Sequence, residues 1–366
     1  MTGEDIMQVL ASRKLRSTAY VFGVWLTLIS ATTANELALN ANPPDHYTVV
    51  PGDTLWGVSE RFLRDPWRWP EIWKGNPEIQ NPHLIYPGDV VVLRYTDGAP
   101  ELHLERGNGI GSTVKLSPEV RSSTIVHPIP TIPLDAIRQF LTQPRVVNRE
   151  ELENAPYVLA GADEHVITAA GDNVYVRGIT QPDARHFMIY RLGSAYRDAP
   201  AGVASTADED ILGHEAVYIG EARLVRSGDP ATLVILRSSS EVRRGDRLLP
   251  TDEQELEQVF QPHAPGADTE GRIIAVLNGV SRIGQGQIVV LNRGTQHGVE
   301  TGHIFAVYQA GQTIQDPLSK VRNDPVTLPD ERAGAVMVFR SFERVSYALV
   351  MQAKGPMHLY DTVKAP

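Results

Sequence analysis

The side chains that enzymes use for catalysis are either missing from this sequence or scattered along it. There is no Cys, which excludes thiol nucleophiles, Cys-ligated metals, disulfides and a lipid anchor on an N-terminal Cys. The 11 His form neither an H-x-H nor an H-E-x-x-H pattern, and no G-x-S-x-G turn or P-loop is present. The acidic run Asp208 to Asp210 is typical of a solvated loop rather than of the two facing carboxylates of a glycosidase. We therefore predict a protein that is not an enzyme and that needs no metal or other cofactor.

Two motifs near the N-terminus point to a binding domain instead. YTVVPGDTLWGVSERF begins at Tyr47, and PEIWKGNPEIQNPHLIYPGDVVVL begins at Pro70. Their order of strand, P-G-D-T-L-W turn and helix, second helix and closing I-x-P-G-D strand resembles a LysM domain over residues 47–93. Proteins of that family bind glycans that contain N-acetylglucosamine, commonly peptidoglycan or chitin. The resemblance implies that this chain binds such a glycan.

The resemblance also implies where the glycan lies, in a groove between two loops. The first loop is Gly52, Asp53, Thr54, Leu55 and Trp56, and the second contributes Pro77, Ile79, Asn81, Leu84 and Ile85. A sugar presents an apolar ring face and an acetyl methyl beside hydroxyl and amide groups, so such a groove needs apolar surface next to backbone donors. Residues 46–94 hold five Lys or Arg and six Asp or Glu, which favours a neutral glycan over a polyanion.

Residues 46–94 are patterned as a β-α-α-β unit that would position these loops. A β-rich run ends at the Pro51-Gly52 turn, and Asp53 is expected to cap a helix with apolar residues at Leu55, Val58 and Phe62. A second helix is expected from Pro70 to Gly75, and a strand from Val90 to Leu93. Trp69 and Trp73 have helical spacing, which favours core positions over a platform for stacking sugars.

The N-terminus, residues 1–34, has the order of a secretory signal peptide. Basic residues precede an apolar run at 19–29, and small residues follow up to Ala34, after which we expect cleavage. This predicts a periplasmic or cell-envelope protein. The alternative is an uncleaved N-terminal membrane anchor, although the run is shorter than the ~20 residues of a spanning helix. Acidic residues before the basic cluster leave Met1 and Met7 both open as the true start.

The remaining sequence contains a connector and a duplication. Residues 95–133 form a Pro-rich connector, and 134–156 a short helix (LDAIRQFL) with a linker. GDNVYVRG at 171–178 then matches GQIVVLNRG at 286–294, and similar pairs follow at matching spacing. We predict an α+β multidomain protein in which the small βααβ domain precedes two similar, mainly antiparallel β barrels or sandwiches. The two repeats are expected at 157–250 and 272–366, with an acidic, Pro-containing linker and short helix between them at 251–271.

Charge and domain order complete the prediction. A formal net charge of −10 without a basic cluster argues against nucleic acid as a partner. The whole arrangement resembles uncharacterised LysM-containing envelope proteins of Gram-negative bacteria. We expect the first domain to bind peptidoglycan and the β repeats to act as a spacer or to contact another envelope protein. Two alternatives stay open: a cell-wall enzyme with an unrecognised catalytic β domain, and a component of a secretion, flagellar or pilus assembly.

Overall fold

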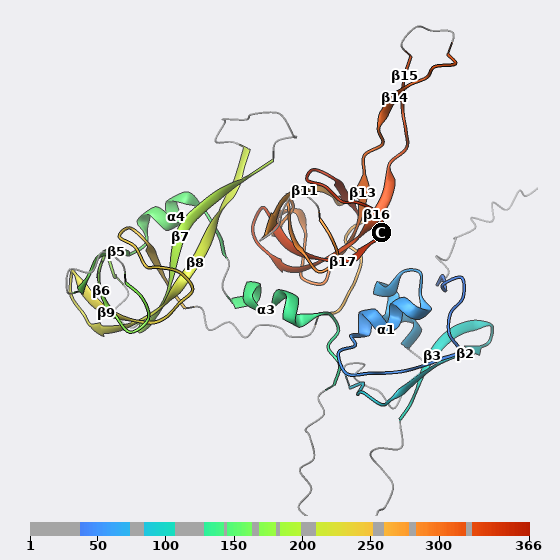
Figure 1. The fold of residues 1–366 in the computed structure, drawn as a ribbon, viewed down its shortest axis with the longest axis horizontal. Coiled ribbons are helices and arrows are strands. Elements are labelled where there is room, and N and C mark those ends of the chain that lie inside the picture. The colour runs from blue at the N-terminus through green and yellow to red at the C-terminus, as the bar shows by residue number, and fades with distance from the viewer. Residues whose placement is uncertain are drawn as a thin grey trace, which may run out of the picture. The chain divides into compact units, whose positions relative to one another are not determined.

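The computed structural model describes residues 37–73, 84–106, 128–142, 145–162, 168–180, 184–198, 210–251, 260–277, 283–319 and 324–366 (Figure 1). The expected signal peptide lies outside these ranges, as do residues 253–259 of the short helix expected at 253–260 in the linker. Within them, no helix has the length and apolar character needed to cross a membrane.

The N-terminal domain consists of a three-stranded antiparallel sheet, two short α-helices and a 3₁₀ turn. Its strands pair in the order β1-β2-β3, so each residue of β2 between Val90 and Thr96 has a partner on β3. The elements are β1 (His46–Thr48), α1 (Leu55–Phe62), the 3₁₀ turn η1 (Pro66–Arg68), α2 (Trp69–Ile72), β2 (Val90–Thr96) and β3 (Ala99–Glu105). Strand β3 adds Leu102 and Leu104 to the core, beyond the expected boundary at residue 94. We use "N-terminal domain" below for residues 37–106.

One type of tight turn recurs throughout the chain. In Val50–Asp53 the N–H of Asp53 donates to the carbonyl of Val50, and the carboxylate of Asp53 accepts from the N–H of Val50. Gly52 has a φ of 94°, as the third position of a type II turn requires. The same reciprocal bonds close turns that end at Asp89, Asp172, Asp246, Gln287, His303 and Asp361. Among the described residues, a polar side chain after a residue with positive φ thus closes seven such turns; a strand follows six of them, and helix α1 follows the turn at Asp53.

The first β domain is a ring of six strands. Its order is β8-β7-β10-β5-β6-β9, and a further pairing of β8 with β9 closes the ring. Its elements are β5 (Tyr157–Gly161), β6 (Asn173–Arg177), β7 (His186–Arg197), β8 (Ile211–Arg226), β9 (Ala231–Ser238) and β10 (Arg247–Pro250). Helix α3 (Leu134–Thr142), strand β4 (Arg145–Val147), which pairs with β8, and helix α4 (Arg149–Asn154) precede it.

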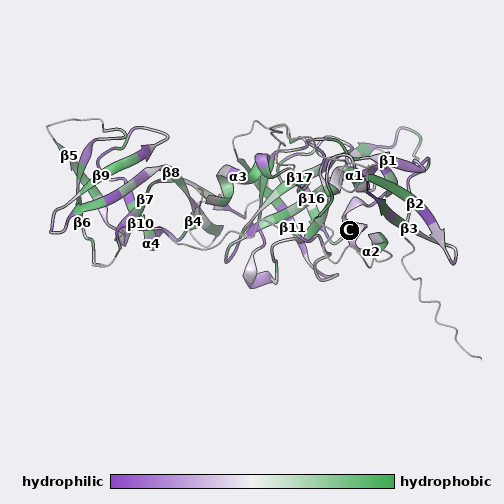
Figure 2. Ribbon diagram, turned by 90° about the horizontal axis from the view of Figure 1, so that it is seen from below, coloured by the Kyte–Doolittle hydropathy of each residue, from purple (hydrophilic) through white to green (hydrophobic). Residues whose placement is uncertain are grey.

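The second β domain is a closed barrel with the same topology. Its order β11-β12-β17-β16-β13-β18 equals that of the first ring when β5, β6, β7, β8, β9 and β10 are matched to β11, β12, β13, β16, β17 and β18. Its strands are β11 (Glu270–Leu277), β12 (Ile288–Leu291), β13 (Ile304–Gln309), β16 (Glu331–Ser341), β17 (Ser346–Ala353) and β18 (Thr362–Lys364), with a 3₁₀ turn η5 (Thr295–His297). Hydrophobic residues mark the strands of both barrels (Figure 2). The predicted fold class, an α+β multidomain protein with a small βααβ domain followed by two similar antiparallel β domains, is confirmed.

A hairpin extends from the second barrel between β13 and β16. It consists of β14 (Thr313–Gln315) and β15 (Pro325–Thr327), paired with each other only (Figure 1). Its apolar side chains are exposed, with Leu318 at 90% relative exposure. The hairpin therefore contributes nothing to the barrel core and is a surface feature.

Candidate functional site

The first predicted loop forms the start of helix α1. The expectation that Asp53 caps helix α1 is wrong. Asp53 instead caps the preceding turn and also accepts a hydrogen bond of 3.0 Å from the Tyr47 hydroxyl. The N-cap is Thr54, whose Oγ1 accepts from the N–H of Gly57 at 3.0 Å. Burial, followed by the hydrogen bond to Asp53, raises the pKa of Tyr47. Asp53 and Thr54 are therefore committed to fixing the loop.

Leu55 and Trp56 follow as the first two residues of the helix. Their side chains are 2% and 3% exposed, so neither presents an apolar surface to solvent. Their N–H groups lack partners within the helix, because the first turn of any α-helix leaves its donors unsatisfied. Any hydrogen bond that these two residues make outside the helix therefore comes from the backbone rather than from the side chains.

Only part of the second predicted loop lies within the described residues. Pro77, Ile79 and Asn81 fall outside them. Leu84 is 43% exposed, while Ile85 is fully buried in the core of the domain. The described part of this loop therefore offers the Leu84 side chain and the backbone carbonyl of Ile85.

A segment from the expected connector lies between the two loops. The N–H of Ile129 donates to the carbonyl of Ile85 at 2.8 Å. The N–H groups of Leu55 and Trp56 donate to the carbonyls of Pro130 and Thr131 at 2.9 and 3.1 Å. Ile129 and Thr131 are 4% and 3% exposed, so the contact is tightly packed. We call residues 128–132 the strap; sequence reasoning missed it because it is far from both loops along the chain.

The tryptophans of the N-terminal domain are packing residues. Trp69 and Trp73 are 3% and 8% exposed and belong to its core, as their spacing predicts. Trp56 packs in a cluster that includes Ile132 of the strap, and Trp67 lies partly buried against it. None of these four rings forms an exposed platform on which a sugar could stack.

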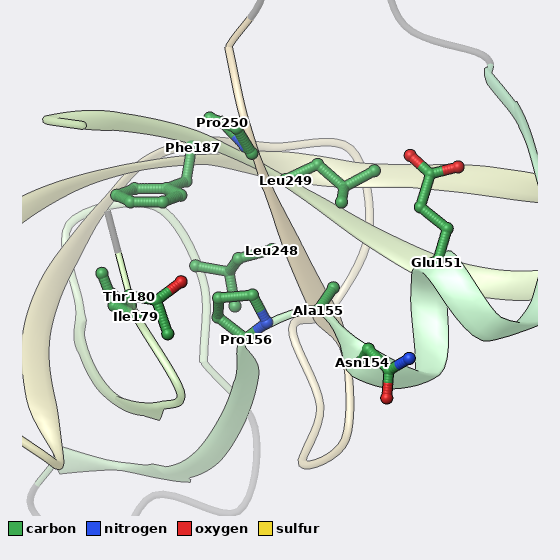
Figure 3. A pocket seen from close by; sticks show the side chains of 10 residues that line it. All are labelled: Glu151, Asn154, Ala155, Pro156, Ile179, Thr180, Phe187, Leu248, Leu249 and Pro250. Carbon is green, nitrogen blue, oxygen red and sulfur yellow. The ribbon is translucent and has the colours of Figure 1, made fainter.

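The first barrel carries a cavity of about 310 Å³ beside helix α4 (Figure 3). Its floor is apolar, with the side chains of Phe187, Leu248 and Leu249, and Figure 3 shows Glu151 and Asn154 at the helix side. The lining residues have one carboxylate, on Glu151, one hydroxyl, on Thr180, and no histidine that could act as a base. Paired acid–base catalysis needs a second titratable side chain beside Glu151, and the residues that line this cavity supply none.

Two histidines that are 40 positions apart come together in the second barrel. Ligand atoms of His263, Glu300 and His303 all lie within 4.8 Å of one another, and the imidazole centroids are 4.5 Å apart. The sequence, in which the histidines are scattered, therefore did not predict this pair. However, Nδ1 of His303 accepts a hydrogen bond from the N–H of Glu300 at 3.1 Å, at the position where most turns of this type carry Asp. His303 is thus already used as a turn cap, and burial, then the charge of His263, lowers its pKa.

Comparison with protein families identifies a LysM domain at residues 47–94, which confirms the resemblance found in the sequence. The match covers most of strands β1 and β2, both helices and both loops of the predicted site. A search of curated proteins found no relative of the chain. A LysM domain is a carbohydrate-binding module whose general ligand is a glycan with N-acetylglucosamine, and the N-terminal domain is assigned that role.

Proposed function

We propose that the protein is a non-catalytic component of the bacterial cell envelope that holds peptidoglycan glycan strands through its LysM domain. The observation that carries this proposal is the LysM match at residues 47–94. The N–H groups of Leu55 and Trp56 and the carbonyl of Ile85, which bond to residues 129–131 in this structure, have the chemistry that an acetamido group needs. Among the described residues, neither the cavity of the first barrel nor the histidine pair supplies a catalytic arrangement.

The two barrels then act as a spacer and as a contact surface for another envelope protein. Exposed apolar residues support this role. Single exposed apolar residues are common on protein surfaces, but several on one hairpin are typical of a surface that contacts a partner. The β14–β15 hairpin and its flanks expose Ile314, Leu318, Val326 and Leu328 at 46%, 90%, 41% and 43%. Export by cleavage after Ala34 belongs to the same proposal, and mass spectrometry of periplasmic protein that finds residues 19–29 retained would contradict it.

Co-sedimentation with purified sacculi tests the glycan site. A fragment of residues 37–142 should sediment, and a fragment of residues 145–366 should stay in solution. Many glycan repeats on one sacculus retain a protein by rebinding, so even a dissociation constant of about mM to µM for one shallow site is sufficient. Release of soluble fragments from the sacculi would instead reveal an enzyme.

Substitutions at two predicted site residues distinguish glycan contact from helix capping. Asn81→Ala should weaken sedimentation while the melting temperature stays unchanged. Thr54→Ser retains the capping hydroxyl and serves as the matched control for Thr54→Ala, which loses it. If the 145–366 fragment sediments as well as the whole chain, while 37–142 is folded and does not, the proposed function is wrong.

A further inference from the structure

We propose that the strap, residues 128–132, is an internal occupant of the glycan groove, and that a glycan must displace it in order to bind. The inference rests on the proposed glycan-binding function. It concerns a segment outside the LysM match, which ends at residue 94.

The strap uses the same groups of the groove that a glycan would need. Its three hydrogen bonds involve the N–H groups of Leu55 and Trp56 on one loop and the carbonyl of Ile85 on the other. Each N–H has one hydrogen and makes one good bond, so Leu55 cannot donate to the strap and to a sugar at once. Strap and glycan therefore exclude each other wherever they need the same donor.

The chemistry of the strap imitates that of the sugar. The acetamido group of N-acetylglucosamine has one N–H, one C=O and a methyl group, and a peptide unit carries the same N–H and C=O. In the strap, Ile129 supplies the N–H and an apolar side chain, and Pro130 and Thr131 supply the carbonyls. A groove that accepts this arrangement fits an acetamido group by the same hydrogen bonds.

The prolines of the strap favour the bound shape before it docks. Pro128 and Pro130 fix their own φ, and a residue that precedes a proline, as Ile129 does, is restricted to extended conformations. Fewer conformations are lost when the segment enters the groove, so docking costs less entropy. Pro130 also has no N–H, so it leaves no donor without a partner inside the contact.

Tethering makes the strap an effective competitor. A segment linked to its own site acts at an effective concentration on the order of mM, similar to the weaker end of the expected glycan affinity. When only a fraction of molecules has an open groove, the apparent dissociation constant rises by the inverse of that fraction. A strap that is docked in about nine of ten molecules would weaken glycan binding about tenfold.

Titration of the chain from Asn35 onward with the β-1,4-linked tetramer of N-acetylglucosamine tests the inference. Two variants release the strap: Ile129→Asp, which places a charge in the apolar contact, and replacement of residues 128–132 by five Gly and Ser residues. Leu318→Asp, at a position that is 90% exposed on the hairpin, is the matched control for an apolar-to-Asp change. Isothermal calorimetry should show about tenfold tighter binding for both strap variants and no change for the control.

Hydrogen exchange gives an independent measure of strap occupancy. The amides of Leu55 and Trp56 should be protected in the unmodified chain, exchange faster in the strap variants, and regain protection when the tetramer saturates those variants. The replacement variant decides the outcome if Ile129→Asp does not fold.

The outcomes separate the two proposals. Unchanged or weaker tetramer binding by the strap variants, with sacculus binding retained, overturns the strap inference alone, because the strap would then be a bystander or a wall of the groove. If neither the unmodified chain nor the variants bind tetramer or sacculi, the proposed function fails and the strap inference fails with it.

Discussion

Strand β3 should be required for the stability of the LysM domain, although it lies beyond residues 47–94. Leu102 is 1% exposed and packs in the same cluster as Leu55, Trp69 and Ile85. Leu102→Ala removes buried methyl groups and leaves a cavity, which costs about 3 kcal/mol within the usual range of roughly 2 to 5. A domain of about 70 residues has a free energy of unfolding of roughly 4 to 10 kcal/mol, so the loss is a large part of the total.

Urea unfolding of a fragment of residues 37–106, followed by tryptophan fluorescence, measures this loss, because Trp69 and Trp73 are buried in the same cluster. Tyr95→Ala on β2 is the control, since Tyr95 is 64% exposed and should change the free energy of unfolding by less than about 0.5 kcal/mol. A fragment that ends at residue 94 should be less stable still. If Leu102→Ala matches the control, β3 is not part of the folded domain and the boundary drawn here is wrong.

Other substitutions test the turns and the first loop. Asp246 is 3% exposed and forms a bidentate ion pair with the partly exposed Arg191 at 2.8 Å, so Asp246→Asn should lower the free energy of unfolding by about 2 kcal/mol, as measured by urea denaturation of residues 145–366. Asp361 closes the matching turn of the second barrel, and burial raises the pKa of its carboxyl. Its stabilising contribution therefore decreases as pH rises above about 4. Asp361→Asn should increase the thermal midpoint at pH 7 but not at pH 4. Burial lowers the pKa of His303, so as pH falls this histidine is protonated in the unfolded chain, near pH 6.5, before it is protonated in the folded protein. Stability is therefore lost as pH falls from 7 to 5. His303→Gln, which keeps a hydrogen-bond acceptor, should reduce that loss in melting curves. Thr54→Ala should cost about 1 kcal/mol in urea denaturation of residues 37–106, and an equal stability of Thr54→Ser and Thr54→Ala would contradict the capping role.

The elements with a strong local signal were predictable from the sequence. The alternating apolar residues of the barrels, the duplication and the β-α-α-β order of residues 46–94 all reappear in the structure. Matching topology follows from duplication, because two similar sequences fold to the same strand order. Strand β3 also has a signal in the sequence: Asp97-Gly98 is a two-residue hairpin turn with φ of 51° and 84°, followed by alternating Leu102 and Leu104.

Contacts between distant residues were not predictable in this way. His263 and His303 belong to different segments, and each looks like an ordinary surface histidine until the barrel closes. The helix cap is Thr54, one residue after the predicted Asp53, because the carboxylate of Asp53 bonds within the preceding turn instead. A turn and a helix that follow each other directly compete for the same polar side chains, and the pattern alone does not decide between neighbours.

The strap shows why a proline-rich segment can be structured without forming an element of its own. Prolines at 128, 130 and 133 exclude a helix and weaken any strand, so the sequence indicates a connector there. The same residues hold the chain extended and reduce the number of its own donors that need partners. Such a segment cannot form its own backbone hydrogen bonds, but it can accept them from the start of helix α1. There Leu55 and Trp56, whose N–H groups have no partner within the helix, donate to its carbonyls. The composition therefore indicated a segment outside any helix or strand, whereas its position depended on an unsatisfied helix end more than 70 residues away.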